Sequence, residues 1–427
     1  MIRNEQKVWI YKNYFLPSVR FLLTVHDLTQ THVQQLDAFT HVFLKRWASL
    51  PPSATNLVIH MKVGLNISTI ETLYHTCHSL THTAMRLKGD ITVNSAIDNA
   101  LQRESEWTRK KSTVVYSESV HTFAVAMTCV NEEVRALSDD SNNKENTKST
   151  QKVKASVKAK VYSDNLEEQR RHLDTLIKQG DYLRFADQEK CDPNWNSIIY
   201  NLPKGTMKFL LNSFTNTLPT QDNLKLWGKT FSDKCHLCKN RDSTTHCLNG
   251  CRVSLNQGRF TWRHNNIVNY IVQSVDTSNY KVHSDLPGHE TSNGGSLPPS
   301  MVVTNLKPDI VIIDDNKKKA TIFELTCPME HNINKQHKYK ADKYAHFETD
   351  IRTHNTTVCA FEVSSRGPLT NENIVRLSSI HKYLKKHIKK STFIKNIRTL
   401  STLSSYYIFT ARKNQTWDHT AFINPPF

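Results

Sequence analysis

The sequence contains no long hydrophobic run. Nowhere among its 427 residues does an apolar stretch approach the ~18 residues that a membrane span requires. The N-terminal stretch MIRNEQKVWIYKNYF also lacks the apolar core of a secretory signal. These absences predict a protein without a membrane partner.

Cysteine is sparse and irregularly placed. The nine cysteines form no even framework of the kind found in disulfide-rich secreted domains, and four of them lie close together with a histidine. A reducing compartment and a metal site fit this arrangement better than a set of disulfides.

Acidic residues are outnumbered by basic ones. The chain has 39 Asp and Glu against 56 Lys and Arg, which gives a formal net charge of +17. This balance indicates a polyanionic partner, most often nucleic acid, although it specifies no chemistry. The length allows two or three domains, and a hydrophobic content of 38% is enough for packed cores.

The N-terminal region, residues 1–137, has a helical pattern. Thr29 can cap a helix, because its side chain can accept a hydrogen bond from the first turn. On pattern alone the region is an ordinary helical bundle. The residues expected on the apolar face of this helix, at spacings of three and four, are Val33, Leu36, Phe43 and Trp47.

A change of composition follows this region. Residues 138–164 are mostly polar and cannot bury enough apolar surface to order themselves, so they predict a flexible linker. Helical pattern resumes over residues 165–230, which we interpret as a helical connector.

A cluster of metal-ligand residues comes next. The stretch KCHLCKNRDSTTHCLNGCR reads C-x2-C-x7-H-x4-C through Cys235, Cys238, His246 and Cys251. Zinc binds four thiolate or imidazole ligands in a tetrahedron, and a C-x2-C turn supplies two of them. The pattern predicts a structural zinc with no open coordination position. Cys247 either replaces His246 or packs beside it.

This zinc knuckle, residues 231–254, could contact nucleic acid, because basic side chains that suit phosphate surround its ligands. These side chains are Lys234, Lys239, Arg241 and Arg252.

An acidic hairpin is expected further along the chain. Two apolar runs, Ile310–Ile313 and Thr321–Leu325, lie on either side of a charged turn, Asp314–Lys319. Asp309 begins the first strand and Glu324 lies near the end of the second. Antiparallel neighbours can therefore bring the two carboxylates together at one end of a sheet.

Two lysines follow the hairpin on an expected helix. Lys340 and Lys343 are three residues apart and share a helix face. Two acids and a nearby lysine suit metal-dependent phosphodiester cleavage, because carboxylates hold a hard cation such as Mg²⁺ and an ammonium group neutralises phosphate. Such residues also occur together by chance in many α/β domains.

An amphipathic helix is expected over residues 258–275, between the cluster and the hairpin. It carries Arg263 and His264, which form either a solvated basic turn or a contact with phosphate. Lys307, just before the hairpin, is a further candidate for nucleic-acid binding.

The C-terminal region, residues 255–427, alternates helices and strands. A third strand is expected over 356–365, so the order is helix, strand, strand, helix, strand. This order predicts an α/β domain with a mixed sheet covered by helices.

These motifs together resemble a known family. Pro308-Asp309, a carboxylate on the next strand and then a basic residue is similar to the PD-(D/E)xK nuclease pattern. Thr326 stands where the simplest form has its lysine. The sequence Lys340-Ala-Asp-Lys343-Tyr344 instead resembles the K-x-x-K-Y of restriction-like endonucleases in non-LTR retrotransposons, where the lysine lies on the helix.

The resemblance extends over most of the chain. The cysteine cluster, WRHN and KPD occur in the same order in the C-terminal regions of those elements, and FLPSVRFLLTV, FLKRWASLP and GLNISTIETLY resemble their polymerase thumb. The resemblance implies an α+β multidomain protein with an N-terminal helical, thumb-like region. A zinc knuckle and a C-terminal α/β PD-(D/E)xK restriction-like endonuclease domain with a mixed central sheet would follow.

The resemblance also implies roles for individual residues. Asp309 and Glu324 correspond to the magnesium ligands, Lys340 to the catalytic lysine, and Lys343 to an assisting one.

The roles of the basic pair follow from the WRHN motif. Arg263 and His264 correspond to the arginine and the histidine of that motif. Asn265 stands at the next position, where the motif usually has an acidic residue. Together with Lys307 and Arg252 they are the expected nucleic-acid-binding residues.

The implied activity is nicking of double-stranded DNA in the nucleus during retrotransposition, with structural Zn²⁺ and catalytic Mg²⁺. The chain lacks the polymerase fingers, palm and paired aspartates, so it resembles the C-terminal part of a reverse transcriptase. Element RNA and a full-length reverse transcriptase are the further expected partners. The alternative is a catalytically inactive, nucleic-acid-binding remnant of such a protein.

Overall fold

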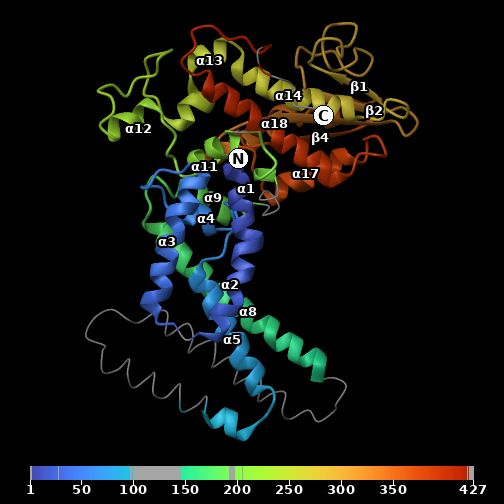
Figure 1. The fold of residues 1–427 in the computed structure, drawn as a ribbon. Helices are drawn as coiled ribbons and strands as arrows, with labels where there is room; N and C mark the ends of the chain where they lie inside the picture. Colours follow the sequence, from blue (N-terminus) through green and yellow to red (C-terminus); the bar gives the residue numbers. More distant parts are fainter. Residues whose placement is uncertain are drawn as a thin grey trace. The chain divides into compact units, whose positions relative to one another are not determined.

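A computed structural model describes residues 2–26, 28–96, 99, 146–191, 198–203, 205–420 and 422. The chain forms two compact units, Met1–Leu176 and Ile177–Phe427, and each is described by itself (Figure 1). Within these described stretches, no helix combines the length and the apolar character that crossing a membrane requires.

The described part of the first unit is built from helices. These are α1 (Asn4–Ile10), η1 (Tyr11–Phe15), α2 (Leu16–Val25), α3 (Gln30–Ala48), α4 (Leu57–His60), α5 (Ile70–Arg86) and α8 (Asn146–Thr175). Residues 97, 98 and 100–137, the end of the expected thumb-like region, lie outside the described residues.

Helix α3 begins where the sequence predicts, because the side chain of Thr29 accepts a hydrogen bond from the backbone N–H of His32. Its buried face differs from the expected one. Leu36 is 42% exposed and Phe43 is 36% exposed, so neither belongs to the core. The buried positions of α3 are Val33, Asp37, Thr40, Leu44 and Ala48.

A buried carboxylate explains this difference. Both oxygens of Asp37 accept backbone N–H groups at the start of α5, from Ile70 at 2.6 Å and Glu71 at 2.9 Å. The first N–H groups of a helix have no partner inside the helix, so Asp37 satisfies two of them. The core face of α3 therefore includes a polar position that hydrophobic periodicity assigns to solvent.

Most of the segment that the sequence predicts to be a flexible linker forms helix α8. Residues 146–164 are helical, and Val153, Val157 and Val161 are buried at a spacing of four. Val153 and Val157 pack with Leu80, which lies on α5. The linker prediction was wrong over this stretch because a narrow valine stripe, buried against another helix, orders an otherwise polar segment. Residues 138–145 lie outside the described residues.

Three side chains of the first unit form a chain of hydrogen bonds. Asn56 Nδ2 lies 3.2 Å from His41 Nδ1, His41 Nε2 lies 2.7 Å from His60 Nε2, and His60 Nδ1 lies 2.7 Å from the carbonyl oxygen of Ile67. Every contact is satisfied when both rings are neutral, with Asn56 and His41 donating toward His60. Burial lowers the pKa of His60 to about 4, and the charge of His41 acts in the same direction.

Mild acid is expected to destabilise the protein through His60. Between its folded pKa of about 4 and the ordinary value of 6.5, the unfolded chain binds a proton that the folded chain does not. The contribution of His60 to the free energy of unfolding should therefore fall by roughly 1 kcal/mol between about pH 7.5 and about pH 5.5. The change in the free energy of unfolding on going to the lower pH, measured by denaturant titration, should be more negative by this amount in the wild type than in His60→Asn.

The variant also serves as the control for other titrating groups. Burial raises the pKa of Asp37 to about 6, which makes its contribution to stability change with pH in the opposite direction. Asp37 is present in both proteins, so the difference between them isolates His60. Equal pH dependence in the two proteins would contradict the assignment.

The second unit combines helices with one sheet. Its helices in the described ranges are α9 (Asp181–Gln188), α11 (Thr206–Phe214), α12 (Gln221–Leu226), η2 (His246–Gly250), α13 (Arg252–Asn256), α14 (Arg259–Ser274), η3 (Glu330–Asn332), α15 (Ile333–Tyr344), α16 (Phe347–Asp350), α17 (Asn371–His381) and α18 (Lys390–Thr410). Its strands are β1 (Lys281–Ser284), β2 (Ile310–Asp314), β3 (Lys319–Thr326) and β4 (Asn355–Glu362).

The sheet is mixed, as the sequence predicts. Its order is β1-β2-β3-β4, with β1, β2 and β3 antiparallel to one another and β3 parallel to β4. The expected hairpin is β2 and β3, whereas β1 is an additional strand that the sequence analysis did not predict. The crossover between the parallel strands contains α15 and α16.

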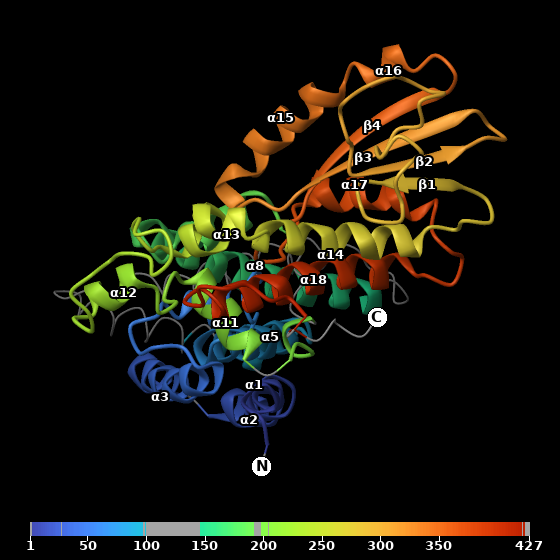
Figure 2. The ribbon, with the colours of Figure 1, turned by 90° about the horizontal axis from the view of Figure 1, so that it is seen from above.

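Helices cover both faces of the sheet. Alternate strand residues such as Ile312, Phe323 and Phe361 belong to a core with α14, α17 and α18. The intervening residues such as Val311 and Ile322 belong to a second core with α15 and α16. Figure 2 shows α14 and α18 running together along one side of the sheet, with α15 on the other. The residue parity along each strand therefore decides which helices a side chain meets.

The connector, the zinc segment and the C-terminal region share one compact unit, although the sequence analysis treated them as successive domains. The guanidinium of Arg366, which follows β4, pairs with the carboxylate of Glu330 at 2.5 Å and donates to the carbonyl oxygen of Ser213 in α11 at 2.6 Å. All three groups are buried. Residues 165–175 of the connector belong to α8, which lies in the first unit.

Candidate metal centres

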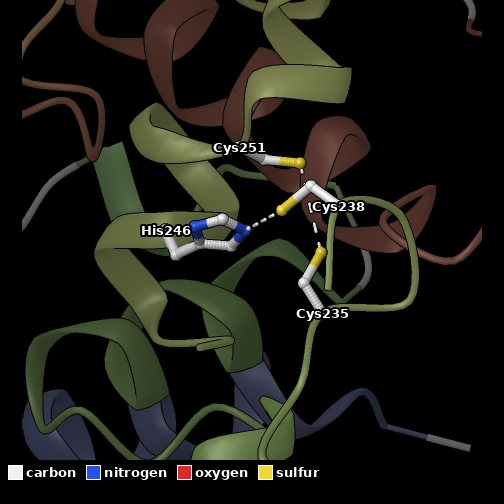
Figure 3. Close-up of side chains that lie close together, drawn as sticks. All are labelled: Cys235, Cys238, His246 and Cys251. Carbon is white, nitrogen blue, oxygen red and sulfur yellow. Dashed lines mark hydrogen bonds between the residues drawn. The ribbon is translucent and has the colours of Figure 1, made fainter. Parts of the chain in front are cut away.

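Four side chains of the zinc segment converge on one point. Figure 3 shows Cys235, Cys238, His246 and Cys251 with their sulfur and nitrogen atoms directed toward one another. Their ligand atoms all lie within 4.8 Å of one another. The Cys235 and Cys251 sulfurs are 4.0 Å apart, and Cys238 Sγ is 3.2 Å from His246 Nε2. Sulfurs bound to zinc at ~2.3 Å in a tetrahedron would be roughly 3.8 Å apart, so the cluster fits this metal.

The electrostatics of the cluster also fit a cation. Burial raises the pKa of Cys235 to about 11, and the nearby Cys251 and Cys238 add to this effect, whereas the backbone N–H groups of Cys238 and Leu237 oppose it. Neighbouring thiolates repel one another, and a divalent cation among them removes that repulsion. The chemistry of the donor set therefore suits Zn²⁺, held by Cys235, Cys238, His246 and Cys251.

Cys247 is not part of the cluster. Its sulfur lies 2.9 Å from Asp242 Oδ1, and burial raises its pKa well above the usual range. The alternative that Cys247 replaces His246 is therefore excluded. Because four protein ligands complete a tetrahedron, a zinc here would be structural.

Basic side chains surround the cluster. Arg241 forms an ion pair with Asp222 at 2.7 Å. Lys234, Lys239 and Arg252 are exposed, and their expected contact with nucleic acid stays a prediction.

The two acids of the hairpin meet at one end of the sheet, as the sequence predicts. Ile310 pairs with Phe323, so Asp309 and Glu324 are opposite each other. The backbone N–H of Asp309 donates to Glu324 Oε2 at 3.0 Å, and the backbone N–H of Leu325 donates to Asp309 Oδ2 at 2.7 Å. Each carboxylate is therefore oriented by the backbone of the other strand.

A lysine from α15 completes this group. Lys340 Nζ pairs with Glu324 Oε1. Burial and the charge of Asp309 raise the pKa of Glu324, whereas Lys340 opposes the shift. The buried Glu324 and the half-buried Asp309 repel each other and offer oxygen ligands of the kind that a hard divalent cation prefers.

The second lysine is oriented differently. Lys343 Nζ donates to the hydroxyl of Tyr344 at 3.0 Å and lies 4.7 Å from the centre of that ring. The structure therefore places Lys340, and not Lys343, in contact with the acids. Thr326, which stands where the resembled nuclease pattern has its strand lysine, has a buried hydroxyl without a hydrogen-bond partner among the described residues.

His264 reaches the acidic group from α14. Its Nε2 lies 3.1 Å from Asp309 Oδ2, and its Nδ1 lies 3.0 Å from Asn265 Oδ1. Burial disfavours a charged ring, but the charge and hydrogen bond of Asp309 outweigh it and raise the pKa of His264 to about 9. Both ring nitrogens then donate. Asn265 thus supplies an acceptor where the resembled motif has an acid.

Arg263 does not have the expected role. It is 1% exposed, so its guanidinium cannot reach a phosphate in solvent. It donates instead to the carbonyl oxygens of Leu248 at 3.0 Å and Cys327 at 3.1 Å. Leu248 lies between two zinc-segment ligands, and Cys327 follows β3. Arg263 therefore ties the cysteine cluster to the acidic end of the sheet, and its assignment as a nucleic-acid contact was wrong.

Two further acids lie at the same end of the sheet, and the sequence analysis missed both. Asp285 follows β1, and its backbone N–H donates to the carbonyl oxygen of Asp309 at 3.3 Å. Glu362 ends β4, where it pairs with Thr326 of β3. By parity, Asp285, Asp309, Glu324 and Glu362 all project toward the face that α15 covers.

Glu362 is held by two basic groups. It is buried, and it accepts from His337 Nδ1 at 3.0 Å and from Arg376 at 3.3 Å. His337 lies three residues before Lys340 on α15, so successive turns of one helix face contact Glu362 and Glu324. Side chains alternate between the two faces of a strand. This alternation along the predicted strand 356–365 was a signal that could have placed Glu362 beside Glu324.

Lys307 is exposed near these acids. Burial raises the pKa of Asp285, and the positive charge of Lys307 opposes this shift. A contact between Lys307 and nucleic acid stays a prediction.

One family model matches part of the chain. Residues 181–257 match a zinc-binding domain in reverse transcriptase. The match begins at the first residue of α9 and extends through α13, so it includes all four cluster residues and the helices before them. No curated protein matches the chain. The match and the cluster together support a structural zinc and suggest a retrotransposon-type protein that associates with nucleic acid.

Proposed function

We propose that this protein is a Mg²⁺-dependent DNA endonuclease of the restriction-like, PD-(D/E)xK group that nicks double-stranded target DNA in retrotransposition. The observation that carries the proposal is the meeting of Asp309, Glu324 and Lys340 at one end of the sheet. Two acids from adjacent strands and one ammonium group form the minimal constellation for metal-dependent phosphodiester hydrolysis. The net charge of +17 supports a nucleic-acid substrate.

Each residue of the proposed nuclease site would have a distinct role. Asp309 and Glu324 would hold Mg²⁺, which supplies a hydroxide near neutral pH and offsets charge on phosphorus. Lys340 would position the attacking water and neutralise a phosphate oxygen. His264 donates to Asp309 and so fixes its orientation. Hydrolysis adds water across one phosphorus–oxygen ester bond and leaves a nick in one strand.

The proposed setting is retrotransposition, to which the zinc-binding match lends support. Nuclear DNA would be the substrate, and element RNA and a full-length reverse transcriptase would be further partners. The exposed Lys234, Lys239 and Arg252 beside the cluster would contact phosphates.

A second candidate function is binding without cleavage. The family match covers a zinc-binding segment and none of the acids at the end of the sheet, which is also what a nucleic-acid-binding remnant would present. A plasmid assay separates the endonuclease from the remnant. The endonuclease should convert supercoiled plasmid to open circles with Mg²⁺ and should not do so with a chelator. Salt-dependent DNA binding without any conversion would favour the remnant.

The two lysines provide a sharper test. Lys340→Ala should lower the nicking rate about 100-fold or more, since loss of one group that stabilises developing charge costs ~10²–10³-fold. Lys343→Ala, which removes the same charge one turn away, should change the rate less than ~10-fold because Lys343 contacts Tyr344. Initial rates of plasmid nicking measure both. An equal loss in the two variants would contradict the distinct roles.

A further inference from the structure

A large groove lies on the helical side of the second unit. Its volume is about 900 Å³, and its walls are α14, the segment 385–389 and α18. Known ligand sites have volumes of ~300–1,000 Å³, so the groove is large enough for a bound molecule. Because α14 and α18 belong to the core on one sheet face and α15 covers the other, the groove lies away from the carboxylates that project toward α15.

The lining of the groove is polar and carries no negative charge. Asn266, Asn269 and Gln273 are spaced by three and four residues, so they share one face of α14. Lys385, His387 and Lys389 also line the groove. No acidic residue is among the described residues that line the groove. Such a surface suits a ligand with phosphates and with groups that both donate and accept hydrogen bonds.

Hydrogen bonds hold the walls in place. The backbone N–H of Lys385 donates to the carbonyl oxygen of Ser274 at 3.0 Å, and its Nζ donates to the carbonyl oxygen of Gln273 at 2.9 Å. Asn396 of α18 donates to the hydroxyl of Tyr270 at 3.0 Å. A preformed wall loses little conformational freedom on binding, which favours affinity.

We propose that this groove binds a single-stranded segment of nucleic acid. Lys385, His387 and Lys389 would contact successive phosphates, and the carboxamides of Asn269 and Gln273 would contact base edges. A single strand is favoured because only unpaired bases leave their hydrogen-bonding edges free for side chains such as the exposed carboxamides of Asn269 and Gln273. The inference goes beyond the proposed nuclease function, because it assigns a second nucleic-acid site on another face of the unit.

The segment itself contains a matched control. Lys385 and Lys389 line the groove, whereas Lys386 and Lys390, which are also exposed and also four residues apart, do not. The double variants Lys385→Glu/Lys389→Glu and Lys386→Glu/Lys390→Glu therefore carry the same change of charge on neighbouring positions. Only the first pair alters the groove.

The measurement is binding of fluorescent single strands of roughly 20 nucleotides, longer than the ~4–16 nucleotides of known single-strand sites. The groove variant should bind the strand at least about 10-fold more weakly than its control. The slope of log affinity against log salt concentration should also be smaller in magnitude by roughly 1–1.5, since each lost phosphate contact removes ~0.7 from that slope. DNA and RNA strands of one sequence, measured in parallel, identify which of the two is bound.

A neutral variant tests the base contacts. Asn269→Ala/Gln273→Ala removes two exposed carboxamides without changing charge, and it should weaken strand binding while leaving the salt dependence unchanged. Equal affinity losses in the two charge variants would show diffuse attraction and overturn the proposal. An equal loss for duplex DNA would overturn the single-strand assignment. Plasmid nicking should stay within about 3-fold of wild type in every variant, so failure here is distinguishable from failure of the nuclease proposal.

Discussion

Replacing Asp309 with asparagine is expected to lower the rate of Mg²⁺-dependent plasmid nicking more than ~100-fold, because mutation of groups that only support a metal ligand already costs ~10–100-fold. Asparagine keeps the shape of the side chain and an oxygen that can accept the N–H of Leu325. The sheet should therefore stay intact while the negative charge that would hold the cation is lost. DNA affinity should stay within a few-fold of wild type, because binding rests mainly on exposed basic groups.

The turn at the other end of the hairpin supplies the control. Asp315 is exposed and pairs with Lys281, so Asp315→Asn removes the same charge away from the acidic end. Its nicking rate should match wild type. Nicking by Asp309→Asn at the wild-type rate would exclude the proposed site, even if the protein proved to be a nuclease. Absence of nicking in the wild type, with folded and DNA-binding protein, would exclude the proposed activity itself.

Replacing Cys238 with serine is expected to remove zinc and to lower the midpoint of thermal unfolding of the second unit by roughly 20 °C or more. Binding of a structural zinc is worth ~10–16 kcal/mol in small zinc-finger peptides, and each lost kcal/mol shifts the midpoint of a unit of this size by ~2–4 °C. Metal content by mass spectrometry should fall from one zinc per chain to a small fraction. Calorimetry of the same samples measures the shift in midpoint.

Cys247 provides the matched control. It lies in the same segment, outside the cluster, and its sulfur faces Asp242, a contact that a serine hydroxyl can also make. Cys247→Ser should therefore keep one zinc per chain. Full zinc retention by Cys238→Ser, or equal zinc loss in both variants, would contradict the ligand assignment.

Zinc loss should also impair nicking, because hydrogen bonds join the zinc segment to the end of β3. Arg263 bridges Leu248 of the zinc segment to Cys327 at the end of β3, and Asn249 donates to the same Cys327 carbonyl at 2.8 Å. Disorder of the zinc segment would release the strand end that carries Glu324. The cysteine cluster therefore stabilises the orientation of the acids without contacting them.

Local features of this protein could be predicted from the sequence. The C-x2-C-x7-H-x4-C spacing specifies its four ligands because the turns that present them are short and the metal's geometry is demanding. The pairing of Asp309 with Glu324 follows from the hairpin, since a tight turn sets the register of the two strands. The cap of α3 by Thr29 is a similarly local effect.

Features that join distant segments were decided only by the tertiary structure. Whether Lys340 or Lys343 meets Glu324 depends on the rotation of α15 against the sheet, which helical periodicity leaves open. The burial of Arg263 and the position of Glu362 depend on segments far away in the chain.

The order of helix α8 is also a feature that only contacts between distant segments decide. Its polar composition predicts a linker, yet burial of its valines, two of which pack with Leu80 of α5, supplies free energy that orders it. Sequence alone therefore determined the ligands, the hairpin and the caps, each set by contacts within a few residues. The tertiary structure decided which side chains reach the acidic end of the sheet and which segments are ordered, because both depend on packing between elements that are remote in sequence.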